Sequence, residues 1–89
     1  MDDLDELLRA ISHQERRRLL KRCWSAPTTA GELASSSKLA IASVSEHLKV
    51  LRKTGLVAVE KQGRVWLYRT DRTAVKLLLR RLSSTFELD

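Results

Sequence analysis

The chain has 89 residues, of which 43% are hydrophobic, and its 17 lysines and arginines against 11 aspartates and glutamates give a net charge of +6. This size allows one domain, and the apolar content is too high for a disordered chain. The apolar runs are too short for a membrane span, and the acidic start, Met1–Asp3, is unlike a signal peptide. The single cysteine, Cys23, excludes an internal disulfide and fits a reducing compartment. We expect one cytoplasmic domain over residues 1–89.

The positive charge is concentrated in the middle of the chain. Residues 9–86 hold all 17 basic residues and only five acidic ones. Such an excess is typical of a surface that binds a polyanion, although a solvated basic face without a ligand explains the charge equally well. The motifs must distinguish these two interpretations.

Two helices are predicted before the only proline, Pro27. The first is amphipathic, because its apolar residues recur with helical spacing: Leu4, Leu7, Leu8 and Ile11. Ser12 ends this helix and begins the second, since Ser12 and Glu15 have the spacing of a capping box, and the second helix runs to about Cys23 or Trp24.

Two further helices are predicted after Pro27. Thr29 and Glu32 repeat the capping-box spacing and open a short helix, which the serines at 35–37 end by about residue 36. After a turn of three or four residues, an amphipathic helix covers residues 41–54 and ends at Gly55. Its apolar residues share one face: Ile41, Val44, Leu48 and Leu51.

The remaining pattern is a hairpin followed by a last helix. β-branched and aromatic residues at 56–60 and 65–70 predict two strands, joined by a four-residue connection at 61–64. Asp71 caps a final helix with apolar residues at Val75, Leu78, Leu79, Leu82 and Phe86. The predicted fold is mainly α with a two-stranded β-hairpin wing, in the order α-α-α-α-β-β-α. This order is typical of a winged helix-turn-helix, in which the second helix of the pair enters the major groove of DNA.

Three segments resemble the ArsR/SmtB-type transcriptional repressors. They are GELA at 31–34, VSEHLKVLRKTGLV at 44–57 and GRVWLYR at 63–69, and the resemblance extends over residues 4–86. It implies a homodimeric, sequence-specific DNA-binding repressor whose first and last helices form the dimer interface. Because the sequence has no Gly-rich phosphate loop, nucleophile motif or paired carboxylates in an apolar setting, we expect no enzymatic activity.

The sequence departs from the metal-sensing members of this family. Those members carry a Cys-x-Cys-type motif just after Glu-Leu, whereas Glu32-Leu33 is followed here by Ala34-Ser35-Ser36. Others bind metal on the last helix through Asp and His, but no histidine follows His47. A site for zinc or a soft metal needs several converging thiolates or imidazoles, and the chain offers only Cys23, His13 and His47. We expect no metal and no cofactor.

The candidate DNA-binding residues lie on the helix at 41–54 and on the hairpin tip at 61–64. They are Ala42, Ser43, Ser45, Glu46, His47, Lys49, Arg52, Lys53, Lys61, Gln62 and Arg64. The helix is expected in the major groove, and the wing on the minor groove or the phosphate backbone.

Two residues of this set have a structural alternative. Glu46 either accepts from cytosine N4 or pairs with Lys49 one turn on. His47, at the edge of the apolar face, either contacts DNA or is a half-buried, hydrogen-bonded histidine. For the strand at 65–70, we expect at least one of its two faces to pack in the core, and Cys23 is interpreted as a buried small hydrophobe.

The candidate dimer interface combines the apolar residues of the two terminal helices. They are Leu4, Leu7, Leu8, Ile11, Val75, Leu78, Leu79 and Leu82. The alternative is that the last four complete a monomer core, but a chain this short has little core to cover them. The competing function is a winged-helix protein-interaction module that does not bind DNA. The basic residues of the helix at 41–54 and of the wing favour DNA.

Overall fold

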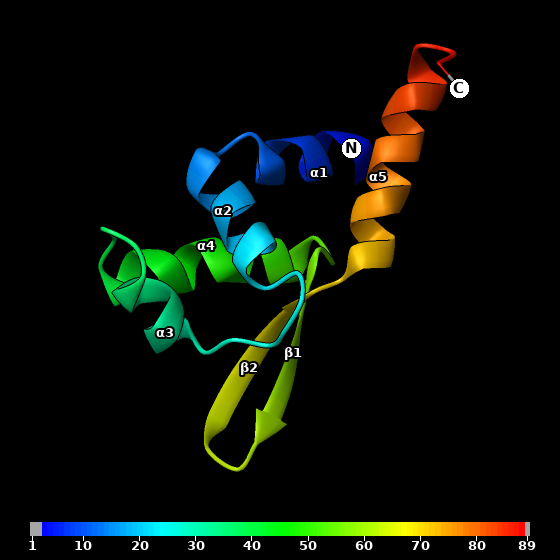
Figure 1. Ribbon diagram of the computed structural model, residues 1–89. Coiled ribbons are helices and arrows are strands. Elements are labelled where there is room, and N and C mark those ends of the chain that lie inside the picture. The colour runs from blue at the N-terminus through cyan, green and yellow to red at the C-terminus, as the bar shows by residue number, and fades with distance from the viewer. Residues whose placement is uncertain (1–2, 89) are drawn as a thin grey trace.

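The computed structural model describes residues 3–88, so that Met1, Asp2 and Asp89 of the predicted domain lie outside it. Within these residues the elements are α1 (Asp3–Ile11), α2 (Gln14–Arg22), α3 (Ala30–Ser35), α4 (Ile41–Lys53), β1 (Val57–Gln62), β2 (Val65–Thr70) and α5 (Arg72–Thr85). Their order confirms the predicted fold class. Figure 1 shows α1 and α2 on one side of α4, the hairpin extending away from the helices, and α5 rising beside α1.

The core is built on one face of α4. Val44, Leu48 and Leu51 are completely buried, as the helical period predicts, and Cys23 is buried with them. The helical period also predicts Ile41 on this face, but Ile41 is 57% exposed. Ile41 is the first residue of α4, and the packed part of the helix begins one turn later at Val44.

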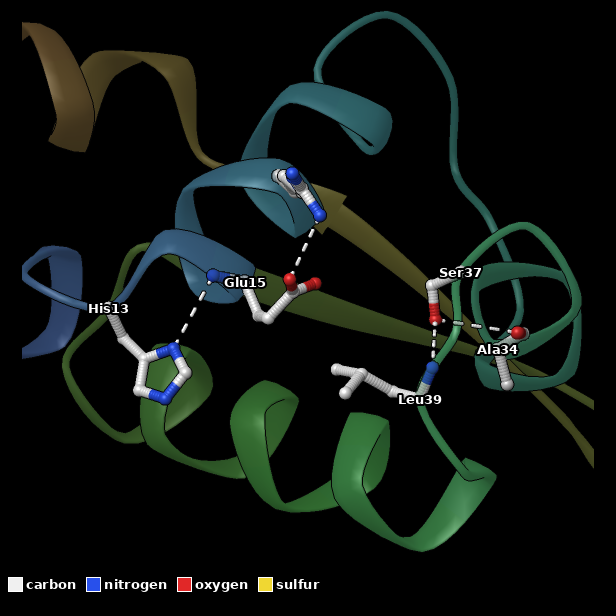
Figure 2. A network of polar contacts seen from close by, with 6 residues as sticks. His13, Glu15, Ala34, Ser37 and Leu39 are labelled. Carbon is white, nitrogen blue, oxygen red and sulfur yellow. Dashed lines mark hydrogen bonds and ion pairs between the residues drawn. The ribbon is translucent and has the colours of Figure 1, made fainter.

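The start of α2 differs from the prediction. His13, not Ser12, is the N-cap, and its Nδ1 accepts a hydrogen bond from the backbone N–H of Glu15 at 3.4 Å (Figure 2). The hydroxyl of Ser12 donates to the carbonyl oxygen of Arg9 at 2.7 Å, which confirms the prediction that Ser12 ends the first helix. Glu15 forms an ion pair with Arg18 at 2.9 Å rather than completing a capping box.

The helix-turn-helix pair α3 and α4 begins and ends close to the predicted positions. Thr29 caps α3, since its hydroxyl oxygen accepts from the backbone N–H of Glu32 at 3.1 Å. In the turn before α4, the hydroxyl of Ser37 donates to the carbonyl oxygen of Ala34 and accepts from the backbone N–H of Leu39 (Figure 2). Gly55 follows α4 with φ of 81°, the left-handed conformation expected after a helix.

The hairpin turn is shorter than predicted. Gln62 pairs with Val65, so only Gly63 and Arg64 connect the strands, instead of four residues. Lys61 and Gln62 extend β1 because ladder hydrogen bonds use the backbone and do not require apolar side chains. Gly63 has φ of 65° at the first position of this two-residue turn, where a glycine is favoured.

Two connections fix the base of the hairpin to the rest of the fold. The backbone groups of Thr28 and Tyr68 exchange two hydrogen bonds of 2.9 Å. The buried hydroxyl of Thr70 donates to the carbonyl oxygen of Leu20 in α2 at 2.7 Å. Hydrogen bonds at the base of the wing therefore fix its orientation relative to the helices.

Candidate nucleic-acid interface

The outer face of α4 is polar and exposed, opposite the face that forms the core. All of its candidate residues except His47 are exposed: Ala42, Ser43, Ser45, Glu46, Lys49, Arg52 and Lys53. An α-helix fits the major groove of B-DNA, where polar side chains reach the base edges. The exposed polar face of α4 is therefore available for DNA, as the prediction for this helix requires.

Glu46 makes no hydrogen bond or ion pair to Lys49 in the part of the chain that the structure describes. The ion pairs there are Glu15–Arg18 and Glu60–Arg69. An exposed i, i+3 pair contributes only tenths of a kcal/mol, so its absence costs little. The carboxylate of Glu46 is exposed and free to accept a hydrogen bond from a ligand.

The tip of the wing is basic. Lys61, Gln62 and Arg64 are all exposed, and Arg64 lies in the two-residue turn itself. Further up the hairpin, Glu60 and Arg69 form an ion pair at 3.6 Å with both side chains about half exposed. Such a surface pair contributes little to stability. Because Glu60 is paired with Arg69, it does not compensate the positive charges of Lys61 and Arg64 at the tip.

Trp66 links the wing to α4. Its ring centroid lies 5.0 Å from Cζ of Arg52 in α4 and 4.8 Å from Nζ of Lys61 in β1. Trp66 itself is 36% exposed, and Val65 on the other strand face is 48% exposed, so neither strand face is wholly in the core. Tyr68, half-buried, packs against the core. No pattern in the sequence indicates this contact, because Arg52 and Trp66 lie in different elements of the fold.

His47 is half-buried and hydrogen-bonded, as one of its two interpretations predicts. Its Nδ1 accepts from Nε of Arg16 at 3.3 Å, and its ring centroid lies 4.5 Å from that of His13. Burial lowers the pKa of His47 below its ordinary value of 6.5, and the nearby His13 and Arg16 lower it further. Sequence gave no signal for this cluster, because Arg16 and His47 are 31 positions apart.

Acidification is expected to destabilise the protein through His47. The unfolded chain protonates His47 near pH 6.5, whereas the folded chain resists protonation to a lower pH. The stability from a neutral His47 is therefore complete above about pH 6.5 and is lost as the pH falls through the lowered pKa. Between pH 7.5 and pH 5, the Tm of the wild type should fall further than the Tm of His47→Gln. Equal losses for the two proteins would contradict this account.

The terminal helices divide their apolar residues between the protomer core and the surface. Leu7, Ile11 and Val75 pack against the protomer's own core, and Leu78 is only 2% exposed. Of the other candidates, Leu79 is 56% exposed, and Leu4, Leu8 and Leu82 are half-buried. Three apolar residues outside the candidate interface are also exposed, namely Leu77, Phe86 and Leu88.

Cys23 and the residues at the family's metal positions have structural partners. Burial raises the pKa of the Cys23 thiol, although the hydrogen bond with Thr28 opposes this. Ser36 ends α3, and its hydroxyl donates to the carbonyl oxygen of Leu33 at 3.1 Å. Within residues 3–88, no three His, Cys, Asp or Glu side chains come together in a way that would hold a metal ion. Over the same residues, no helix combines the length and apolar character needed to cross a membrane.

A helix-turn-helix pair with an exposed polar second helix, followed by a basic hairpin, defines a winged helix-turn-helix DNA-binding domain. The family described as "Helix-turn-helix domain" matches residues 11–60. The chain is 32% identical over 73 residues to the transcriptional activator HlyU of Vibrio cholerae, covering 82% of this chain and 68% of HlyU. It is 31% identical over 81 residues to the HTH-type transcriptional regulator YgaV of Escherichia coli, covering 90% and 82% of the two chains.

Solved structures agree with these relatives. The ArsR-like transcriptional regulator from Rhodococcus sp. RHA1 superposes with a TM-score of 0.86 at 26% identity, over 96% of this chain and 80% of that one. The chain therefore belongs to the ArsR-type family of winged helix-turn-helix transcriptional regulators. It is a DNA-binding regulator rather than an enzyme.

Proposed function

We propose that the protein is a homodimeric, sequence-specific repressor that places α4 in the major groove and residues 61–64 on the minor groove or the phosphate backbone. The observation that carries this proposal is the division of α4 into two faces. Val44, Leu48 and Leu51 anchor the helix in the core, and the opposite face is exposed and polar. The exposed basic wing adds a second point of contact.

The residues of α4 have different proposed roles. Ser43, Ser45 and Glu46 read base edges, and a carboxylate in the major groove is suited to cytosine N4. Lys49, Arg52 and Lys53 position the helix on phosphates. Glu46 is the most informative of the three base-reading residues. Its carboxylate is repelled by the DNA backbone, and only a specific base contact offsets that repulsion.

Glu46→Gln is expected to change which bases are preferred while leaving the protein folded. The amide keeps the size of the side chain, but it donates as well as accepts, so cytosine loses its advantage over adenine. Sequences selected from random duplex DNA by the wild type and by Glu46→Gln should differ at one position of each half-site. Glu6→Gln, an exposed change on α1, is the matched control. If Glu46→Gln selects the wild-type sequence, Glu46 does not read bases.

The proposed dimer joins the terminal helices of two protomers. Apolar residues are exposed on α5 and just beyond it, at Leu77, Leu79, Phe86 and Leu88, and Leu79 has the helical spacing to share a face with Val75 and Leu82. A chain this short leaves such a surface uncovered unless a second protomer packs on it. Two-fold symmetry then sets the half-sites about one helical turn apart, about 34 to 36 Å.

The proposed sign of regulation is repression. A dimer that occupies two successive major grooves excludes other proteins from the same DNA without any further contact. HlyU of Vibrio cholerae, by contrast, is named an activator. A reporter gene placed behind the selected DNA sequence distinguishes the two signs. Lower expression with the protein present supports repression, and higher expression contradicts it.

Metal ions are expected to change the affinity for DNA by no more than a few-fold. In the described residues no chelating cluster is present, and an effector needs a coupling of about 1 to 3 kcal/mol to act allosterically. Titration of the DNA complex with zinc, cadmium or arsenite checks this expectation. Stoichiometric release of DNA that is abolished by Cys23→Ser would contradict it and indicate a site shared between protomers.

A further inference from the structure

We propose that Trp66 is a positioning residue that holds Arg52 of the recognition helix and Lys61 of the wing together as one binding site for a DNA backbone phosphate. This inference rests on the proposed function, because it assigns a role in DNA binding to a residue outside the candidate set. It starts from an exposed aromatic residue that the core does not explain. Trp66 is 36% exposed, in the basic hairpin.

Local structure brings the two cations to one ring. Lys61 and Trp66 are directly opposite each other in the hairpin register, and directly opposite residues project from the same face of the sheet. Arg52 lies in the last turn of α4, and α4 packs against β1. The Arg52 guanidinium carbon is 5.0 Å and the Lys61 nitrogen 4.8 Å from the ring centroid, within the range of a cation–π interaction.

Electrostatics indicates what this arrangement binds. Two like charges that share one ring repel each other, and no carboxylate is paired with either of them among the described residues. The ring attracts both cations and offsets part of this repulsion, since tryptophan has the strongest quadrupole of the aromatic side chains. An anion bound to these cations removes the remainder of the repulsion. On DNA, the group available at the junction of recognition helix and wing is a backbone phosphate.

The arrangement also reduces the entropy cost of binding. Free arginine and lysine side chains each lose rotamer freedom when they bind a phosphate. Stacking on Trp66 restricts both side chains before DNA arrives. Trp66 therefore raises affinity without touching DNA, and its effect requires Arg52 and Lys61.

The test compares Trp66→Leu with Trp66→Phe on the DNA sequence selected by the wild type. Leucine keeps an apolar side chain but has no π face, so both long side chains must be ordered only when DNA binds, and affinity should fall about tenfold. The log–log salt slope should become shallower by about two for the dimer, one phosphate per protomer. Phenylalanine keeps the π face, and its affinity should stay within about threefold of the wild type. Circular dichroism and Tm establish that both variants fold.

A double-mutant cycle separates positioning from a direct contact. In a background with Arg52→Gln and Lys61→Gln, Trp66→Leu should cause no further loss of affinity. The same loss in both backgrounds would overturn the proposal, as would wild-type affinity for Trp66→Leu.

A measurement without DNA separates this proposal from the proposed function. In the free protein, ring currents of Trp66 should shift the side-chain protons of Arg52 and Lys61 upfield in NMR spectra, and Trp66→Leu should abolish these shifts. If the shifts are present but the wild type binds no DNA, the proposed function fails. If the shifts are absent, the positioning role of Trp66 fails even if the wild type binds DNA.

Discussion

Leu79→Glu is expected to convert the dimer into a folded monomer and to lower DNA affinity by a factor of about a hundred or more. Leu79 is 56% exposed in the protomer, so a glutamate there leaves the protomer core intact. In the dimer the carboxylate would have to enter an apolar interface, which is strongly unfavourable. Loss of the dimer also removes the second half-site contact, which contributes about 10² to 10⁴ in affinity.

Sedimentation equilibrium at micromolar concentration measures this effect directly. The wild type should have twice the mass of the 10.2 kDa chain, and Leu79→Glu the mass of one chain. Leu79→Met is the matched control and should remain dimeric. Leu78→Glu should unfold the protein instead, because Leu78 is only 2% exposed. A wild-type protein that stays monomeric at high concentration contradicts the proposed dimer.

The second large effect is the salt dependence of DNA binding. If each protomer neutralises four phosphates, the dimer releases enough counterions for a log–log slope of about −7. Affinity should then fall by about 10⁴ between 50 and 200 mM salt, within the range seen for proteins with many phosphate contacts. A slope near zero would mean that the basic face of the protein does not meet the backbone.

Arg64→Ala tests whether the wing makes some of these phosphate contacts. Its exposed guanidinium lies in the hairpin turn, so its removal should weaken binding to all sequences about tenfold, and to A·T-flanked sites most. The log–log salt slope of the dimer should become shallower by about two. Arg80→Ala on α5 is the matched control, since it removes the same charge far from the wing. Equal effects of the two substitutions would remove the wing from the interface.

Much of the fold follows from hydrophobic periodicity and helix-ending residues. The buried face of α4 and the caps at Thr29 and Gly55 agree with the sequence pattern. The errors occurred where one residue has two possible local roles. Ser12 has the chemistry to begin α2 or to close α1, and the structure uses it for α1. Lys61 and Gln62 look like turn residues, but the backbone continues its ladder through them.

The candidate surface was partly predictable for the same reason. Exposure on the outer face of α4 follows from the period of 3.6 residues once the buried face is known. Contacts between distant segments have no such signal: His47 with Arg16, and Trp66 with Arg52, depend on how helices pack. The leucines of α5 likewise look equivalent in sequence, and only the packing of α5 in the fold distinguishes the buried Leu78 from the exposed Leu77 and Leu79.

Selection of bound fragments from random duplex DNA with the purified wild-type protein tests the central claim most directly. The account predicts enrichment of an imperfect palindrome whose half-sites lie about one helical turn apart, about 34 to 36 Å. It also predicts that two protomers occupy each fragment. Selection without any enriched sequence, or of a single half-site bound by one protomer, would contradict it.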